Sequence, residues 1–513
     1  MANESSYDQI PYPSFTFSQA HPDRLSTMAE FHGINSAPAE SCRVLELGCG
    51  DGTNLLWCAS TLPNSKFVGI DLSAVHIEKA VSGASELNLS NTSFHHGDLL
   101  DFDTKELGQF DYIVAHGLFS WVPDIVRKKI LQIYADCLSP HGVGYISFNA
   151  YPGCHIRQMV GDMMKFHIRG IENPVEKLSQ SRAIINFITN TAETGSVYQY
   201  ILKEELDTIT SRSDSGVIHD DLSEFNDPFY FHEFVEQISD YGFQYLCEAK
   251  SSSEHTANLS AEAKVILDQL GGDRLRREQY IDFITGRRFR WTLICREDIS
   301  LNQEQNPELI NKFFIASQLS PVSKNPDIRS AGVEKFIAKD GSSVEARHPF
   351  TKAALVQLNI NGNRETNFQD LVERCIELCG IEDKSGIDTD ISKTAIYLLE
   401  MFKAGFVYLR RRKTELAYKA GEFPEASQFA RWQIERGSEA IRTLSGVNIK
   451  VDDPYIVGLL RLLDGKKDRS QLALEMSKLF IENGAKPERL GENLTNSIER
   501  ILSRLAETGL LVK

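Results

Sequence analysis

The sequence predicts an α/β fold. We expect a doubly wound, seven-stranded sheet with helical insertions, followed by a C-terminal pair of helical, winged-helix-like modules. Short apolar runs alternate with helical segments between residues 43 and 153, which is typical of a parallel sheet with helices on both faces. A glycine-rich turn joins the first run to the first helix, as it does in nucleotide-binding sheets. A weak internal repeat after residue 345 predicts two copies of one helical unit.

The composition narrows the class of protein. The chain has 513 residues and a net charge of −16, so its surface repels phosphate and no nucleic-acid partner is expected. No window approaches the roughly 20 apolar residues of a membrane span, and residues 1–14 do not have the pattern of a signal peptide, so we expect no stable membrane association. Nine scattered cysteines without zinc-ligand spacing are typical of reduced thiols in a cytoplasmic protein, and no metal site is expected.

Five apolar runs predict the first part of the sheet. The expected strands are RVLELGC (43–49), KFVGIDLS (66–73), TSFHHGDLL (92–100), FDYIVAHG (110–117) and GVGYISFNAYPG (142–153). Helical patterns occupy 52–62, 73–87 and 124–138, between these runs. This order predicts right-handed crossovers and parallel strands.

The glycine-rich turn predicts a binding site for a cationic ligand. Its pattern is Glu46-x-Gly48-x-Gly50-x-Gly52, and glycine allows a sharp turn and close approach of a ligand to the backbone. A carboxylate at Glu46 would repel the pyrophosphate of a dinucleotide but suits a positively charged group. Asp71 ends the second strand, the position from which an acidic side chain accepts hydrogen bonds from ribose hydroxyls.

The ordered motifs LELGCGDG, GIDLS, GDL and FDYIVAHG resemble those of class I S-adenosylmethionine-dependent methyltransferases. The resemblance implies S-adenosylmethionine as cofactor. It implies that the methionine part lies on the turn, the ribose on the end of the second strand and the adenine on the end of the third. The residues implied for cofactor binding are Glu46, Gly48, Cys49, Gly50, Gly52, Asp71, Leu72, Asp98, Leu99, His116 and Tyr12.

The rest of the chain divides into further predicted segments. A sheet of this class ends with a sixth strand and an antiparallel seventh, which residues 229–250 and 287–298 fit. The expected organisation is a core with an N-terminal lid (1–154), a helical insertion (155–225), the second part of the core with a helical insert at 251–286 (226–298), a linker (299–345) and two modules (346–415 and 416–513). The repeat pairs Pro349 and Gly405 with Pro454 and Gly509. The basic run 408–419 between the modules is expected to be a solvated face.

The whole pattern resembles a narrower family, bacterial protein lysine methyltransferases that carry a methyltransferase regulatory domain and modify an outer-membrane protein. The matching stretches include SYDQIPYPSFTFSQAHPDRL (6–25), AHGLFSWVPDIVRKKIL (115–131), NAYPGCHIRQMVGDMM (149–164) and HDDLSEFNDPFYFHEF (219–234). Cys154 departs from the pattern, because a bulky aromatic residue is expected there. The resemblance implies a protein substrate, an outer-membrane or surface protein among the candidates, and a homodimer.

The acceptor site is expected above the carboxyl ends of the strands, where open parallel sheets bind ligands. This geometry selects His116 and Trp121 after the fourth strand and Tyr230 at the helix before the sixth strand as catalytic candidates. Asn149, Tyr151, Asp227 and His232 are expected on the same face, with Tyr7, Tyr12 and Phe15 in a lid.

Each catalytic candidate also has a structural interpretation, and the function has alternatives. For His116 this interpretation is a contact to the cofactor, for Trp121 it is packing at a helix start, and for Tyr230 it is a place in the core. No carboxylate follows the fourth strand in AHGLFSW, so desolvation is expected to help deprotonate a lysine. The alternatives are a small-molecule methyltransferase, for which a sealed pocket would speak, and a cofactor-binding regulatory protein.

Overall fold

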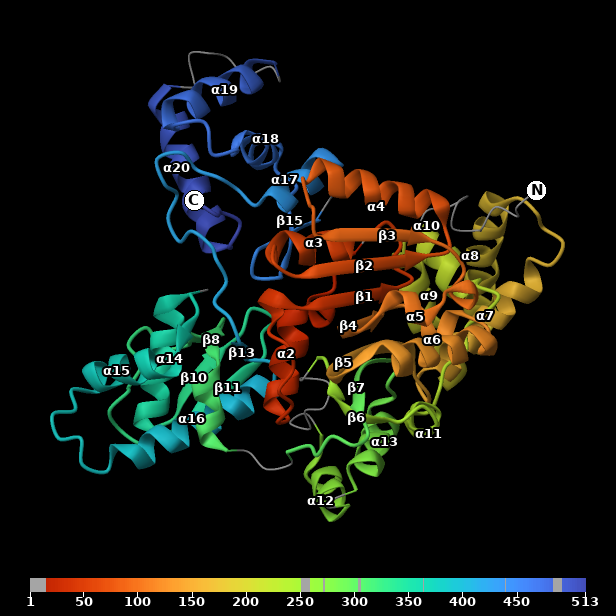
Figure 1. The fold of residues 1–513 in the computed structure, drawn as a ribbon, viewed down its shortest axis with the longest axis horizontal. Coiled ribbons are helices and arrows are strands. Elements are labelled where there is room, and N and C mark those ends of the chain that lie inside the picture. Colours follow the sequence, from red (N-terminus) through yellow and green to blue (C-terminus); the bar gives the residue numbers. More distant parts are fainter. Residues whose placement is uncertain are drawn as a thin grey trace.

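The computed structural model describes residues 15–250, 259–270, 273–302, 306–362, 364–438, 440–482 and 491–513. A central sheet, a helical insertion and two C-terminal modules follow one another along the chain (Figure 1). Within the described residues no helix combines the length and the apolar character that a membrane crossing requires.

The predicted seven-stranded sheet is confirmed. Its order is β3-β2-β1-β4-β5-β7-β6, and β7 is antiparallel to both β5 and β6. The strands are β1 (Arg43–Leu47), β2 (Lys66–Asp71), β3 (Thr92–His96), β4 (Phe110–Ala115), β5 (Leu138–Asn149), β6 (Phe243–Glu248) and β7 (Phe289–Arg296). The order reverses between β1 and β4, which is the switch point where open α/β sheets bind ligands.

Both faces of the sheet are buried, because successive side chains of a strand point to opposite faces. Val44 belongs to one hydrophobic cluster together with residues of α2, α3 and α4, whereas Leu45 belongs to another with residues of α6 and α11. The helices of the core are α2 (Pro22–Phe31), α3 (Thr53–Thr61), α4 (Ala74–Glu86), α5 (Thr104–Leu107), α6 (Asp124–Cys137) and α11 (Phe231–Ser239), with short 3₁₀ turns η1 (Ser18–Ala20), η2 (Ala39–Ser41), η3 (Leu99–Asp101) and η4 (Phe119–Trp121).

The first insertion follows β5 in the chain and forms a helical layer with its own hydrophobic cluster. It contains α7 (Cys154–His167), α8 (Pro174–Thr191), α9 (Val197–Ser211) and α10 (Asp214–Gly216), and it ends in a π-helical turn, η5 (Val217–Asp221). The second insertion contains α12 (Ala261–Gln269) and α13 (Arg274–Thr285).

Residues 299–345, which were expected to be a linker, contain regular structure. They form η7 (Pro307–Lys312), β8 (Phe314–Ser317), β9 (Ser320–Pro321), β10 (Glu334–Ile337) and part of β11 (Ser343–Ala346). β8 lies between β12 (Thr366–Asn367) and β13 (Val407–Arg410). The pairing of β8 with β13 joins residues about ninety positions apart, and such non-local partners leave little signal in the composition of either segment.

The two C-terminal modules have the predicted repeat of helices. Helices begin at Pro349 and Pro454, and Gly405 and Gly509 adopt positive φ angles of 83° and 76° after the last helix of each module. The first module contains α14 (Pro349–Asn361), α15 (Phe368–Cys379) and α16 (Ile387–Lys403); the second contains α17 (Gln428–Glu435), β14 (Ala440–Arg442), β15 (Asn448–Lys450), α18 (Pro454–Leu462), α19 (Arg469–Glu482) and α20 (Gly491–Glu507).

Both modules contact the core through charged side chains. The basic run 408–419 is not the solvated face that the sequence predicts. Arg410 lies 3.5 Å from Asp23 and Arg411 lies 3.6 Å from Glu30, and both acids belong to α2. Their partners are acids on a helix almost 400 positions earlier, so the run alone did not reveal them. In the second module, Trp432 donates a hydrogen bond of 2.8 Å to Glu86 of α4.

Candidate active site

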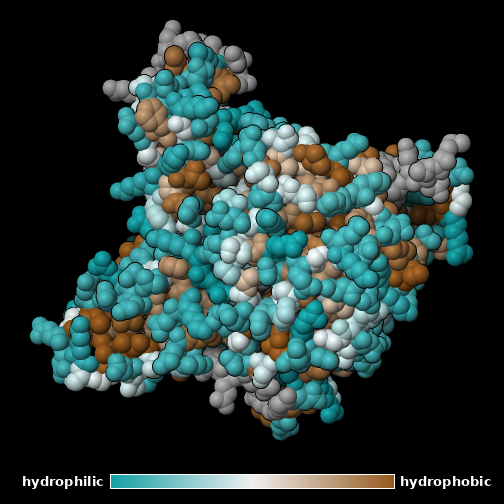
Figure 2. Space-filling view, in the orientation of Figure 1, coloured by the Kyte–Doolittle hydropathy of each residue, from teal (hydrophilic) through white to brown (hydrophobic). Residues whose placement is uncertain are grey.

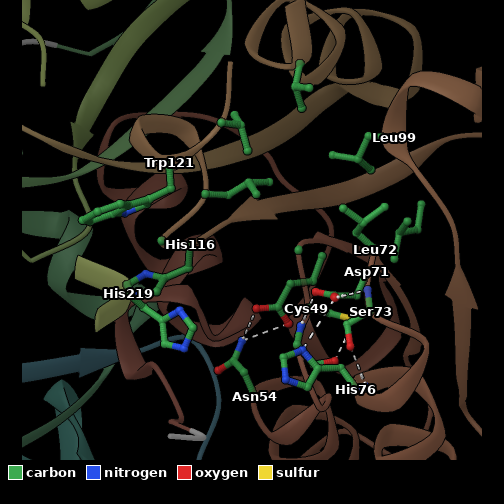
Figure 3. A pocket seen from close by; sticks show the side chains of 18 of the residues that line it. Cys49, Asn54, Asp71, Leu72, Ser73, His76, Leu99, His116, Trp121 and His219 are labelled. Carbon is green, nitrogen blue, oxygen red and sulfur yellow. Dashed lines mark hydrogen bonds and ion pairs between the residues drawn. The ribbon is translucent and has the colours of Figure 1, made fainter. Parts of the chain in front are cut away.

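A cavity of about 1020 Å³ opens at the switch point of the sheet. Ligand sites are commonly about 300 to 1,000 Å³, so this one has room for a large cofactor and part of a second molecule. In Figure 3, Asp71, Ser73 and His76 lie toward one end, and Trp121, His116 and His219 toward the other. We call these the β2 end and the β4 end. The predicted residues that line the cavity are Phe15, Glu46, Gly48, Cys49, Gly50, Asp71, Leu72, Asp98, Leu99, His116, Trp121 and Asn149.

The glycine turn lies at the β2 end with its backbone in the left-handed region. Gly48, Gly50 and Gly52 have φ angles of 68°, 54° and 74°, which residues with a Cβ rarely adopt. A Cβ on Gly50 would meet no atom within 4 Å, whereas one on Gly52 would lie 2.8 Å from Ala80 and Phe94. Gly50 therefore exposes backbone to the cavity, and Gly52 allows the start of α3 to pack closely.

Glu46 is buried at the floor of the cavity and is 3% exposed. Burial raises the pKa of Glu46 to about 8, partly offset by the hydrogen bonds that its carboxylate accepts from Asn54 at 3.1 and 3.3 Å. Burial also raises the pKa of the Cys49 thiol well above its usual value. The site thus holds a carboxyl group that a bound cation would help to ionise.

Asp71 and Asp98 fix the loops at the ends of β2 and β3. Asp71 accepts hydrogen bonds from the backbone N–H groups of Gly50 at 2.8 Å and Ser73 at 2.9 Å. Asp98 accepts one from the N–H of Leu100 at 2.9 Å and so caps η3. Both carboxylates are thereby oriented before any ligand binds.

His116 lies at the β4 end as a neutral ring. Burial lowers the pKa of His116 to about 3. Its Nδ1 lies 2.7 Å from the hydroxyl of Tyr145, and its ring stacks on Phe17 with the centroids 3.5 Å apart. An uncharged imidazole at this position would not repel a sulfonium or an ammonium group.

The structure brings Trp121 to the cavity with His116, but it does not place Tyr230 among the described lining residues. Phe229, one position earlier, packs on Phe119 in the core with 5.6 Å between ring centroids. The ring of Tyr230 faces Tyr151 instead, at 5.2 Å, and its hydroxyl lies 3.1 Å from Nε2 of His155. Topology predicted the right strand end for Tyr230, but the direction of its side chain depends on local packing.

The remaining candidates lie in several places. Asp227 pairs with Arg127 at 2.7 Å, and the ring of His232 contacts Gln279 at 2.9 Å. Cys154 is buried at the start of α7, where its thiol lies 3.0 Å from the carbonyl oxygen of Arg288. Tyr7 and Tyr12 fall outside the described residues.

Sequence reasoning missed several lining residues. The insertion contributes Arg157, His219 and Asp220, and other segments contribute Phe17, Asn54 and Phe289. Arg157 bonds Asp221 at 2.9 Å, and its guanidinium carbon lies 5.8 Å from the ring centroid of Trp121. The signal was in the sequence, because the matching stretch 219–234 begins with His219 and Asp220.

Three family models match the chain. They are a "Methyltransferase domain" at residues 44–142, a "Predicted methyltransferase regulatory domain" at 213–296 and a "PKMT, C-terminal winged helix domain" at 422–511. The regulatory match begins just before η5 and ends with β7.

Similar proteins cover nearly all of the chain. The uncharacterized protein RP789 of Rickettsia prowazekii is 32% identical over 97% of this chain and 90% of its own length. RP028 of the same organism is 38% identical over 48% of this chain and 98% of its own length. The structure of PKMT2 from Rickettsia typhi in complex with AdoHcy superposes with a TM-score of 0.86 at 26% identity, over 98% of this chain and 100% of that chain.

Proposed function

The chain belongs to the class I S-adenosylmethionine-dependent methyltransferases that carry a methyltransferase regulatory domain and a PKMT winged-helix domain, and we propose that it transfers methyl groups to lysine side chains of a protein. One observation carries this proposal: the likeness to PKMT2, with a TM-score of 0.86, extends over 98% of the chain. It therefore includes the insertion and both modules as well as the sheet that all class I enzymes share.

We assign the β2 end of the cavity to the cofactor. Glu46 would pair with the ammonium of the methionine part, and backbone N–H groups of the turn would donate hydrogen bonds to the carboxylate of that part. Asp71 would accept hydrogen bonds from the ribose hydroxyls. The AdoHcy bound by PKMT2 supports this class of cofactor. The proposed cofactor residues are Glu46, Gly48, Cys49, Gly50, Gly52, Asp71, Leu72, Asp98, Leu99, His116 and, outside the described residues, Tyr12.

We assign the β4 end to the acceptor amine. The nitrogen must approach within about 3 to 3.5 Å of the methyl carbon, in line with sulfur. A nitrogen–carbon bond forms as the carbon–sulfur bond breaks, the bonding electrons stay on sulfur, and the product is a methylammonium group. A lysine with a pKa near 10.4 must lose a proton before attack, and transfer into a water-poor cavity lowers its pKa.

His116 and Trp121 are the proposed residues beside the reacting groups. A ring with a pKa of about 3 is a weak base, so His116 would accept a hydrogen bond from the amine rather than remove its proton. The face of Trp121 would stabilise positive charge by about 0.5 to 2 kcal/mol. Tyr230 lies in the aromatic cluster with Tyr151 and His155, and we assign it a positioning role at the start of α7.

Methyl labelling tests the proposed reaction. The purified chain is incubated with methyl-labelled S-adenosylmethionine and an outer-membrane protein fraction from a Gram-negative bacterium, and labelled protein is hydrolysed to amino acids. The expected result is label in methylated lysine, and the Asp71→Ala variant is the control. Label confined to small molecules from a whole lysate would instead support a small-molecule methyltransferase.

We propose an outer-membrane or surface protein as substrate, and modification in the cytoplasm before export. All nine cysteines are free thiols, which is typical of a reducing compartment. Methylation of newly made precursor in spheroplast cytosol, and not of mature protein on intact cells, is the expected outcome.

We also propose a homodimer formed through the insertion. Its exposed apolar side chains include Phe166, Val175, Phe187, Val197 and Tyr200, which are 61% to 77% exposed. Figure 2 shows hydrophobic residues at the edge of the molecule where α7 lies. Patches of this kind mark interaction sites. Sedimentation at micromolar concentration should give twice the 57.7 kDa chain mass, and Phe187→Asp should shift it to the monomer.

A further inference from the structure

The β4 end of the cavity contains a carboxylate that no motif of the methyltransferase core supplies. Five acidic residues line the described part of the cavity: Glu46, Asp51, Asp71, Asp98 and Asp220. The first four lie in or directly after β1, β2 and β3, where we place the cofactor. Asp220 comes from η5, the last turn of the insertion. A carboxylate outside the cofactor motifs therefore faces the space left for the acceptor.

The turn that carries Asp220 is held rigidly by its neighbour. The side chain of Asp221 is 2% exposed and lies 2.9 Å from Nε of Arg157 and 2.6 Å from Nη1 of Arg212. Both distances are typical of strong, charge-assisted hydrogen bonds. Asp221 thus joins α7 and the end of α9 to η5. π-helical turns of this kind are frequent at functional sites.

Asp220 lies farther from Arg157 than Asp221 does, and its side chain is partly exposed. One of its oxygens lies 3.5 Å from Nη2 of Arg157, and its side chain is 25% exposed. That nitrogen of Arg157 is buried and donates no hydrogen bond to any described residue. The two adjacent aspartates therefore differ: Asp221 lies close to both arginines, whereas Asp220 lines the cavity and is partly exposed.

The surroundings of Asp220 suit a lysine side chain. Next to it on the turn, His219 is 4% exposed and lies with His116 and Trp121 at the β4 end (Figure 3). Trp121 offers an apolar wall for the methylene groups of a lysine, and neutral His116 does not repel its charge. A carboxylate beside this wall distinguishes a cationic side chain from a neutral one.

We propose that Asp220 recognises the ammonium group of the acceptor lysine, so that the regulatory insertion completes the substrate site. This inference rests on the proposed lysine substrate. The insertion then contributes directly to substrate choice, in addition to any regulatory role. Asp220 binds the cation on arrival, the ammonium releases its proton to solvent water at this partly exposed carboxylate, and the neutral amine moves on into the drier space beside the cofactor.

Kinetics of matched variants test this proposal, with poly-L-lysine and the outer-membrane protein fraction as acceptors. Asp220→Asn removes the charge without changing the shape, and Asp220→Glu keeps the charge. Asp214→Asn is the control, because Asp214 is an exposed acid of the same insertion that pairs with Arg182 at 2.7 Å. Calorimetry with S-adenosylhomocysteine and thermal melting are measured on every variant.

Asp220→Asn should raise the acceptor KM at least tenfold, with cofactor affinity within twofold of wild type and an unchanged melting temperature. Asp220→Glu should recover part of the loss, and Asp214→Asn should match wild type. The difference in KM should shrink as salt is added, since salt screens exposed charges. Asp221→Asn should lower the melting temperature, as expected for a residue that holds the turn.

Two results would overturn the inference. One is an Asp220→Asn enzyme with wild-type KM for both acceptors; the other is an equal loss in Asp214→Asn, which would indicate a general charge effect. Failure of the lysine assignment has a different signature, because the wild-type enzyme itself would then place no label on lysine in either acceptor.

Discussion

The two ends of the cavity are built in different ways. The β2 end comes from one stretch of about fifty residues, and backbone conformation largely determines its shape. Three glycines have positive φ angles, and Asp71 accepts a hydrogen bond from the N–H of Gly50. The β4 end combines side chains from the loop after β4, η4, β5, α7, η5 and β7. The proposed cofactor site is therefore local in sequence, whereas the proposed acceptor site beside it depends on the packing of distant segments.

The largest effect should come from Gly50→Val at the β2 end. Valine at a φ of 54° is strained, and its side chain would enter the space where we place the cofactor. We expect at least a hundredfold loss of affinity for S-adenosylhomocysteine by calorimetry. Gly437→Val is the matched control, because Gly437 has a φ of 74° and open space around it in the second module. Equal losses in both variants would point to misfolding.

Trp121→Ala should affect the β4 end alone. Removal of the aromatic wall should lower turnover on a protein acceptor at least tenfold, about 1.4 kcal/mol in the barrier, with cofactor affinity nearly intact. Initial rates at saturating cofactor measure the effect. Phe423→Ala, which removes an exposed aromatic side chain of the C-terminal region, serves for comparison. A large loss of cofactor affinity in Trp121→Ala would break the division between the two ends.

Cofactor binding should depend on pH through Glu46. Burial raises the pKa of Glu46 to about 8, and a bound ammonium would lower it, so binding below pH 8 should release a proton. Affinity should therefore rise from pH 6 to about 7.5, where the cofactor amino group is still charged, by up to tenfold per unit. Calorimetry in buffers of different ionisation enthalpy measures the number of protons released on binding. Glu46→Gln should bind more weakly and show no such slope; an unchanged slope would reject this role.

The smallest effect should come from Glu86→Gln on α4. Glu86 pairs with Arg436 at 2.9 Å and accepts a bond from Trp432, but both charged side chains are about 40% exposed. Exposed pairs contribute at most about 1 kcal/mol, so the melting temperature should fall by no more than about 2 to 4 °C. Cofactor affinity should stay within twofold. A larger change would mean that the second module influences the β2 end through α4.

Sequence reasoning succeeded where the structural cause is local. Periodicity and glycine spacing predict the strand that begins at Arg43, the turn through Gly50 and the acid at Asp71. It failed for Tyr230, because the direction of that side chain depends on whether Phe229 packs into the core. It also missed Asp220, since this carboxylate reaches the cavity from a turn about a hundred positions after β4. The strands within 299–345 were missed for the same reason.

The ion pair between Asp23 and Arg410 has a consequence for synthesis on the ribosome. The two residues are 387 positions apart, and at roughly 5 to 20 residues per second about 20 to 80 s separate their translation. Burial raises the pKa of Asp23, and Arg410 and Arg412 oppose that rise. Until those arginines emerge, α2 carries an acid whose final burial is unfavourable. The final electrostatic environment of α2 is therefore complete only after the arginines that follow the helices of the first module have been made.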